Sequence, residues 1–463
     1  MLPKPSACDG CPLKGLSRWY VPDEYVQGAE VLVLGQNPGA DEEQGRRLVR
    51  YDGKHKVYEP HAPAPYLGTT GHDMERSYFP LAGLERGKNV SLANPIRCRI
   101  GDTNELPPLT ETRTREAIEH CQAAYYLPPA STRLVIAEGA YALYAATGED
   151  GKDGPGWGIS REIEGWRGWL LPWNPPPRPR IMWNQVHHPN GEADIVQVLA
   201  TYHLAFLYRA PWYTPVSQRD WSKVQPILAG TWPTPFPEFG VHPPEVWPRT
   251  FAFDTEYYED ERGSHLIRYS MAWRRRGEEP ALYVVERKDH VVPVFLPSAI
   301  QPIFHNVEAD LAHLNRLMGH HKPKITVEDT MYLHAVLWPD LDHTLDFLGS
   351  IYSPYNRTKH LAKANPRVYA AGDALMALAW YPLQGELERD PRVKKVYYEC
   401  QLPLAGIIHK ARQRGLRVVP ERVVQALESM DGRQQDAELL AQAHVGWPLN
   451  LGSPAQVAAE LYA

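Results

Sequence analysis

The second half of the chain is organised around Phe251-Ala252-Phe253-Asp254-Thr255-Glu256, an apolar run that ends in Asp-x-Glu. The run predicts a β-strand, and two carboxylates that lie two positions apart on a strand share one face. We expect the strand to end at this pair. At the end of a strand, the shared face can hold a divalent metal ion through carboxylate oxygens.

Two further blocks of acidic residues follow. Asp310 lies four positions after Asn306, and Asp373 lies four positions after Tyr369. The pattern over residues 368–380 predicts a helix, which would place Tyr369 and Asp373 one turn apart on one face. Any one block alone is read more simply as solvated surface carboxylates. Taken together in order, the three blocks fit a two-metal phosphodiesterase site, in which carboxylates clamp two cations beside the scissile phosphate.

The ordered set D-x-E, N-x-x-x-D and Y-x-x-x-D resembles the motifs of the DEDDy 3′–5′ exonucleases, in particular the proofreading domain of family A (polymerase I-like) DNA polymerases. The resemblance covers residues 249–400 and implies a ribonuclease H-like exonuclease domain that binds two Mg²⁺ or Mn²⁺ ions. It implies that the metal ligands are Asp254, Glu256, Asp310 and Asp373. Tyr369 would position the attacking water, and Asn306 would support the substrate strand.

Length and composition indicate a globular protein. The 463 residues are enough for two or three domains, and 43% of them are hydrophobic while 22% are charged. No apolar run reaches the roughly 18 residues of a membrane span, and the N-terminus has no apolar signal core. We therefore expect a soluble, cytoplasmic protein of prokaryotic or phage-like type. The net charge of −6 does not exclude nucleic-acid binding, because basic patches are local.

The first half has the pattern of a parallel α/β domain. The apolar run Val31–Gly35 predicts a strand, and the turn-rich loop Gln36–Asp41 follows it. Further strands are expected at residues 89–92, 134–137 and 181–185, and helices at residues 112–126 and 140–146. Alternation of strands and helices predicts a parallel sheet, in which ligands bind at the carboxyl ends of the strands.

The cysteines suggest a second metal centre. Cys8 and Cys11 form a C-x-x-C motif, Cys98 and Cys121 lie in the same half, and Cys400 lies elsewhere. An intracellular protein keeps few disulfides, so four cysteines in one half suggest a metal or a cluster. On spacing alone, zinc and an iron–sulfur cluster are equally well supported.

The first half resembles the family-4 uracil-DNA glycosylases over residues 6–210. The matching segments, in order, are Cys8-Asp9-Gly10-Cys11-Pro12-Leu13, Gly35-Gln36-Asn37-Pro38-Gly39, Pro65-Tyr66-Leu67-Gly68, residues 94–99, Cys121, residues 135–140, Arg167-Gly168 and His188-Pro189-Asn190. The resemblance implies a three-layer α/β domain at residues 1–225. It also implies a 4Fe–4S cluster whose ligands are Cys8, Cys11, Cys98 and Cys121.

The resemblance also implies a pocket for uracil that has been flipped out of DNA. Tyr66 can stack under the base, and the amide of Asn94 can pair with the uracil edge as donor and acceptor. His188 can donate to a uracil oxygen as negative charge develops on the departing base. The loop that contains Gln36 and Asn37 would face the sugar and hold the attacking water. Each residue alone is read more simply as an ordinary core or surface residue.

Several positions depart from the family pattern. Gln36 stands where the family usually carries Glu, and Asn37 cannot take a proton from water. Asn190 replaces the usual Ser, and an insertion runs from Leu48 to Pro63. Base recognition is still expected, with weak water activation. The alternative is a non-catalytic uracil sensor or a DNA-binding platform that anchors a polymerase.

The remaining segments complete the expected organisation. Residues 226–249 are rich in proline and predict a stiff, extended linker. Residues 401–463 are helical in pattern and resemble the start of a family A polymerase thumb; alternatively, they cap the exonuclease domain. The polymerase palm and fingers motifs are absent. We therefore expect a replication or repair protein that binds uracil-containing DNA, single strands or 3′ ends, together with a polymerase subunit or a downstream polymerase domain.

Overall fold

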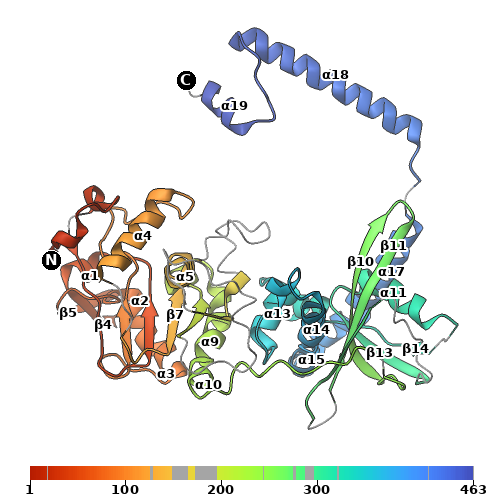
Figure 1. The fold of residues 1–463 in the computed structure, drawn as a ribbon, viewed down its shortest axis with the longest axis horizontal. Helices are drawn as coiled ribbons and strands as arrows, with labels where there is room; N and C mark the ends of the chain where they lie inside the picture. The colour runs from red at the N-terminus through yellow and green to blue at the C-terminus, as the bar shows by residue number, and fades with distance from the viewer. Residues whose placement is uncertain are drawn as a thin grey trace. The chain divides into compact units, whose positions relative to one another are not determined.

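The computed structural model describes residues 1–17, 19–125, 129–148, 165–172, 196–242, 244–274, 278–286, 297–320, 323–415 and 417–461. These residues form two compact units, Met1–Ala405 and Gly406–Ala463. Figure 1 shows that the first unit contains both of the large sheets. The mixed α/β class expected from the sequence is confirmed.

The N-terminal sheet has the strand order β6-β3-β7-β9-β8. Its strands are β3 (Val31–Leu34), β6 (Val90–Ala93), β7 (Leu134–Glu138), β9 (Gln197–Thr201) and β8 (Leu170–Pro172). All neighbours are parallel except β8, which runs antiparallel to β9. The strands expected at residues 31–35, 89–92 and 134–137 are therefore confirmed, whereas residues 181–185 lie outside the described residues.

Both faces of this sheet are covered. On β3, Val31 and Val33 pack into one apolar cluster together with Trp221, whereas Leu32 and Leu34 pack into another. Successive strand residues point to opposite faces, so an unbroken apolar run indicates a strand buried on both sides. The helices and short strands around the sheet are α1 (Ala40–Gln44), β4 (Arg46–Asp52), β5 (His55–Pro60), α2 (Thr69–Asp73), the π-helix Met74–Tyr78, α3 (Phe79–Ala82), α4 (Thr112–Tyr125), α5 (Gly139–Thr147), α8 (Leu204–Leu207), α9 (Thr214–Ser222) and α10 (Val224–Leu228).

The second sheet has the order β12-β11-β10-β13-β14, and β15 also pairs with β13. Its strands are β10 (Thr250–Asp260), β11 (Gly263–Trp273), β12 (Ala281–Glu286), β13 (Ala299–Phe304), β14 (Lys324–Ile325) and β15 (Glu328–Asp329). The first three are antiparallel, and β13 joins β10 in parallel. The helices of this region are α11 (Val307–Met318), α12 (Thr330–Leu337), α13 (Leu345–Tyr352), α14 (Pro366–Ala377), α15 (Trp380–Leu387) and α16 (Pro391–Val396).

The structure corrects the expected end of the strand that carries Asp-x-Glu. Strand β10 continues beyond Glu256 to Asp260, because β11 pairs with it along this whole length. The register shifts between Glu256 and Tyr257, so a bulge, rather than the strand end, follows the two carboxylates. The helix expected at residues 368–380 also differs in its bounds, since α14 ends at Ala377 and α15 begins at Trp380.

The proline-rich stretch between the two sheets is more structured than a free linker. Helix α10 extends into it, since Pro226 lies inside that helix. Further along, the amide of Thr234 donates to the carbonyl of Pro354 at 2.8 Å. The amide of Gly240 donates to the carbonyl of Leu282 at 3.0 Å. Trp232 packs against the core as well. This stretch is therefore held along the surface of the first unit.

The C-terminal residues are helical, as the sequence predicts. Helix α17 (Leu402–Arg414) precedes α18 (Pro420–Val445) and α19 (Pro454–Leu461). None of the described residues of α18 is buried. Among the described residues, no helix combines the length and the apolar character that a membrane crossing requires.

Candidate active sites

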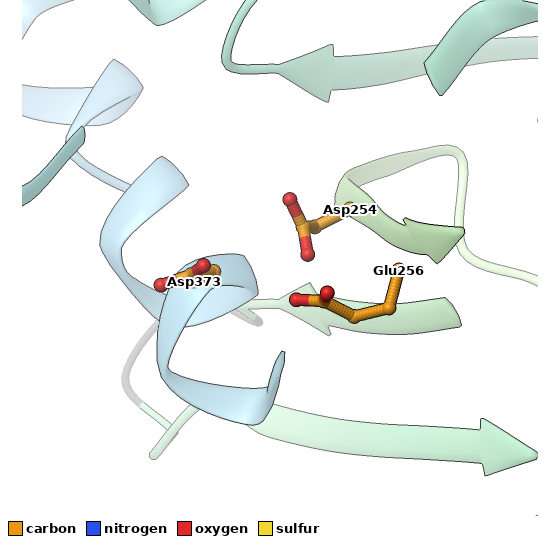
Figure 2. Close-up of side chains that lie close together, drawn as sticks. All are labelled: Asp254, Glu256 and Asp373. Atoms are coloured by element: carbon orange, nitrogen blue, oxygen red, sulfur yellow. The ribbon is translucent and has the colours of Figure 1, made fainter. Parts of the chain in front are cut away.

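Three carboxylates from two elements meet in the second half of the chain. Asp254 and Glu256 lie on one face of β10, and Asp373 comes from α14 (Figure 2). One carboxylate oxygen from each lies within 4.8 Å of the other two. Hard divalent cations such as Mg²⁺ and Mn²⁺ are held by such sets of carboxylate oxygens.

The electrostatics of this cluster favour a bound cation. Burial raises the pKa of Asp254, and the nearby charges of Asp373, Asp310 and Glu256 raise it further. Burial likewise raises the pKa of Asp373 to about 8, although a hydrogen bond from Tyr369 opposes the shift. Ionising all of these groups without a cation is therefore unfavourable at neutral pH. A divalent cation among the oxygens would restore the charged forms.

Asp310 lies beside this cluster and is turned toward the backbone of β10. Its Oδ1 atom accepts a hydrogen bond from the Thr255 amide at 3.1 Å and another from the Thr255 hydroxyl. Asp310 is only 3% exposed, and burial raises its pKa to about 7. The structure thus brings together three of the four expected metal ligands, with the fourth adjacent to Asp254 but bonded to Thr255.

Tyr369 lies one turn before Asp373 on α14, as the four-residue spacing predicts. Its hydroxyl is hydrogen-bonded to the Asp373 carboxyl, and burial is the main reason that its pKa is raised. The hydroxyl of Tyr369 is thus fixed at the edge of the acidic cluster.

Asn306 is the N-cap residue of α11, with a left-handed φ of 69°.

The four cysteines of the first half line one pocket. Cys8 and Cys11 come from the N-terminal turn, Cys98 follows β6 by five residues, and Cys121 lies on α4. None of them is in a disulfide, whereas the fifth cysteine, Cys400, is exposed. Burial raises the pKa of Cys11, and it raises that of Cys98 to about 11.

The lining of the pocket suits a group that is bound by thiolates. Lys4, Lys14 and Arg97 line it together with the cysteines, and the guanidinium of Arg97 donates to the Cys121 sulfur at 3.5 Å. Positive charge at a thiolate stabilises the ligating form. Four converging thiols with nearby cations therefore fit a Cys₄ metal or iron–sulfur centre, and the donor set alone leaves zinc and 4Fe–4S both open.

A polar cluster occupies the carboxyl edge of three adjacent strands, β6, β3 and β7. Asn94 follows β6, Gly35 follows β3, and Glu138 ends β7. A Cβ atom on Gly35 would lie 2.5 Å from the Tyr66 hydroxyl and 2.6 Å from the Asn94 Oδ1 atom, so only glycine fits. The structure thus places Tyr66 and Asn94 side by side at the edge where a ligand is expected.

Tyr66 is held more tightly than an open stacking surface would be. Its side chain is 5% exposed, and its hydroxyl donates to the Glu138 Oε2 atom at 2.7 Å. Its backbone adopts a left-handed φ of 57°, which costs free energy in a non-glycine residue. Asn37, in the neighbouring loop, donates through its side-chain amide to Asn104 at 2.7 Å. His188 lies outside the described residues.

Two residues at this edge were not predicted from the sequence. Glu138 is fully buried, its Oε1 atom has no hydrogen-bond partner among the described residues, and burial raises its pKa to about 8. His203 follows β9, and its Nδ1 atom accepts from the Ala205 amide at 3.2 Å, so Nε2 carries the proton of the neutral ring. Burial lowers the pKa of His203 to about 4. The apolar strand before His203 could have indicated that this residue lies at the carboxyl edge of the sheet.

Glu138→Gln should remove a pH dependence from the stability of the first unit. Because the pKa is about 8 in the folded chain and ordinarily 4.5, the folded chain holds one more proton between these values. Stability therefore falls as pH rises through this window. Between about pH 5 and pH 8, the free energy of unfolding should fall by a few kcal/mol more in wild type than in the variant. The difference grows on the order of 1.4 kcal/mol per pH unit. Urea unfolding at both pH values measures this, and equal losses would contradict the assignment.

Known proteins are similar to parts of this chain. No family model matches the chain. A type-4 uracil-DNA glycosylase from Pyrobaculum aerophilum is 29% identical over 114 residues, which cover 25% of this chain and 45% of that protein. The chain therefore spans less than half the length of this relative.

Two solved structures are similar to parts of this chain, with low TM-scores. Brucella melitensis NrnC with bound Mg²⁺ is 20% identical with a TM-score of 0.24, covering 34% of this chain and 86% of that one. Trypanosoma brucei RNase D in complex with RNA U12 is 16% identical with a TM-score of 0.23, covering 29% of this chain and 55% of that one. TM-scores this low do not assign a fold or an activity.

Proposed function

We propose that the second half of the chain is a metal-dependent 3′–5′ exonuclease that acts on DNA. The observation that carries this proposal is the convergence of Asp254, Glu256 and Asp373 within 4.8 Å, with Asp310 beside them. Carboxylates from a strand and a helix that crowd at raised pKa values are typical of a functional site. The ordered motifs of the sequence point to the same chemistry.

Each residue of the site has a proposed role that follows from its position. Asp254, Glu256, Asp373 and Asp310 would hold two Mg²⁺ or Mn²⁺ ions, which when bound supply an activated water and charge stabilisation at the scissile phosphate. The hydroxyl of Tyr369, bonded to Asp373, lies where it can orient the attacking water. The left-handed Asn306 at the start of α11 would contact the substrate strand.

The test is degradation of a 5′-labelled single DNA strand in the presence of Mn²⁺. We expect a ladder that shortens from the 3′ end and that disappears when the metal is chelated. A 3′-phosphorylated strand serves as the control, because a blocked end should slow the reaction. An intact strand at high protein concentration would refute the exonuclease.

We also propose that the first half recognises uracil in DNA. This proposal rests on the similarity to the type-4 glycosylase and on the placement of Asn94 beside Tyr66 at the carboxyl edge of the sheet. The amide of Asn94 can pair with a uracil edge as donor and acceptor. His203, with its protonated Nε2 atom, is a candidate for the donor role first expected of His188.

Excision is the less supported part of this proposal. Neither Gln36 nor Asn37 can take a proton from water, and the Asn37 amide is bonded to Asn104. A uracil sensor that binds without cleaving is therefore the alternative. In either form, the four cysteines would hold a 4Fe–4S cluster that fixes the N-terminal segment to the sheet. Association with a family A polymerase, as a subunit or as a downstream domain, would couple uracil inspection to 3′-end proofreading.

Asn94→Asp should weaken the preference for uracil over thymine about tenfold, because an acceptor-only carboxylate repels a uracil carbonyl and one lost hydrogen bond costs roughly 1.5 kcal/mol. Binding of strands with one central uracil or thymine measures the preference, and release of free uracil separates glycosylase from sensor. If wild type binds both strands equally, the uracil proposal is wrong.

A further inference from the structure

The hairpin of β4 and β5 is a basic projection in an acidic chain. Residues 46–60 carry five basic and two acidic side chains, a net charge of +3, whereas the whole chain carries −6. Most of the hairpin, from Leu48 to Pro60, lies within the insertion that separates the motif loop after β3 from Tyr66. The function proposed above gives this hairpin no role.

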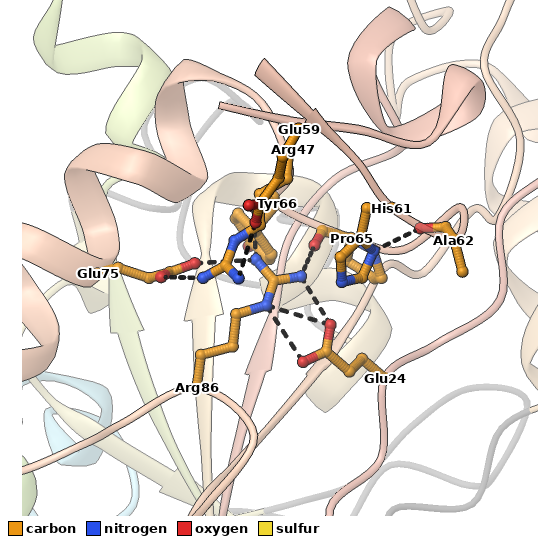
Figure 3. A network of polar contacts seen from close by, with 9 residues as sticks. All are labelled: Glu24, Arg47, Glu59, His61, Ala62, Pro65, Tyr66, Glu75 and Arg86. Atoms are coloured by element: carbon orange, nitrogen blue, oxygen red, sulfur yellow. Dashed lines mark hydrogen bonds and ion pairs between the residues drawn. The ribbon is translucent and has the colours of Figure 1, made fainter. Parts of the chain in front are cut away.

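The base of the hairpin is fixed to the backbone that positions Tyr66. Arg47, on β4, contacts the Glu75 carboxylate at 2.8 Å, and Glu75 also binds Arg86 at 3.0 Å (Figure 3). Arg86 then donates to the carbonyl oxygens of Pro65 and Tyr66, at 2.8 Å in each case. An ion-pair network therefore connects the hairpin to the left-handed Tyr66.

Backbone and apolar contacts strengthen this attachment. The amide of Leu48 donates to the carbonyl of Leu67 at 2.8 Å, and the side chain of Leu48 is only 3% exposed. On the other strand, the Lys56 ammonium donates to the Thr69 hydroxyl at 2.8 Å. The hairpin is thus seated next to the polar edge of the sheet and cannot shift without disturbing residues 65–69.

The tip, by contrast, presents cations to solvent. Arg50, Lys54 and His55 are exposed, and neither Arg50 nor Lys54 has an ion-pair or hydrogen-bond partner among the described residues. Tyr51 is 41% exposed and makes an edge contact with the ring of His72. Asp52 is the one carboxylate in the tip segment 50–56. Unneutralised cations beside an exposed aromatic ring suit a nucleic-acid strand.

We propose that the β4–β5 hairpin binds the phosphate backbone of the DNA strand whose base is presented to Tyr66 and Asn94. Arg50 and Lys54 would contact phosphates that flank the base, and Tyr51 would stack on a neighbouring base. The hairpin would set affinity and strand register, while the edge of the sheet reads the base. This inference rests on the uracil recognition proposed above.

The test compares salt dependence in two double variants of the full chain. Arg50→Gln/Lys54→Gln removes the two tip charges that have no partner among the described residues. Lys88→Gln/Arg113→Gln removes two exposed cations that are each paired with an acid at 2.6 Å. A labelled single strand with one central uracil or thymine is titrated at several salt concentrations, with no divalent metal added so that it stays intact.

We expect the tip variant to bind both strands about tenfold more weakly at low salt, with a salt slope that is smaller by about 1.4 for two lost contacts to a single strand. Its preference for uracil over thymine should equal that of wild type. The control variant should keep the wild-type slope, because its charges are distant in sequence and already neutralised.

The outcomes separate the two proposals. An unchanged slope in the tip variant, or an equal fall in the control, overturns the hairpin proposal even if uracil is preferred. A smaller slope only in the tip variant supports the hairpin proposal even if wild type shows no preference for uracil, a result that would refute uracil recognition alone.

Discussion

Asp254→Asn is expected to lower the exonuclease rate on the order of a thousandfold while the chain stays folded. Asp254 contributes an oxygen to the three-carboxylate cluster, and an amide oxygen carries no charge to hold a divalent cation. A thousandfold lower rate corresponds to about 4 kcal/mol of lost transition-state stabilisation at the metal centre. The labelled-strand assay with Mn²⁺ measures the rate.

The same substitution should not destabilise the metal-free protein. Burial and the neighbouring carboxylates raise the pKa of Asp254, so its charge is unfavourable in the folded chain and a neutral amide relieves the crowding. We expect a melting temperature equal to or above that of wild type.

Two further variants show whether the effect is specific to the cluster. Glu259→Gln removes an exposed carboxylate from the same strand and should leave the rate unchanged. Tyr369→Phe should cost less than Asp254→Asn, because it removes only a hydroxyl that orients water. A ladder that persists at the wild-type rate in Asp254→Asn would mean that this cluster does not catalyse the reaction.

The sequence predicted the parts of this site that depend on local periodicity. Asp254 and Glu256 share a face because strand side chains alternate, and Tyr369 lies one turn before Asp373 because a helix repeats every 3.6 residues. Both relations hold for any strand or helix, so they need no knowledge of the partners. The parallel sheet of the first half followed in the same way from apolar runs that alternate with helical segments.

Relations between distant segments could not be predicted. Asp310 bonds to Thr255, which is 55 positions away, and this orientation depends on how α11 packs on β10. Strand β10 continues past Glu256 because β11 pairs with it, a choice that the residues of β10 alone do not determine. Glu138 lies in the matching segment 135–140, but nothing in that segment indicates its partner, and its hydrogen bond to Tyr66 spans 72 positions. Such polar pairs become visible only when the strand order is known.

The second large effect is expected at the cysteine pocket. Cys121→Ser should lose the proposed cluster and lower the stability of the first half by several kcal/mol, because ligation by segments far apart in sequence contributes folding free energy directly. Cys121 lies on α4 and lines the same pocket as Cys8 and Cys11 of the N-terminal turn, and Arg97 donates to its sulfur. A hydroxyl cannot replace the thiolate at this position.

Wild-type protein purified without oxygen should be brown, with four iron atoms and four sulfides per chain, as a 4Fe–4S cluster requires. Cys121→Ser should be pale and should unfold at lower urea concentration, whereas Cys400→Ser should match wild type, because Cys400 is exposed and apart from the pocket. A colourless wild type with one zinc per chain would instead establish a Cys₄ zinc site. Wild type with neither metal, and a Cys121→Ser variant as stable as wild type, would show that the pocket holds no metal centre. Because colour, metal content and unfolding are measured without substrate, this result is independent of either enzymatic activity.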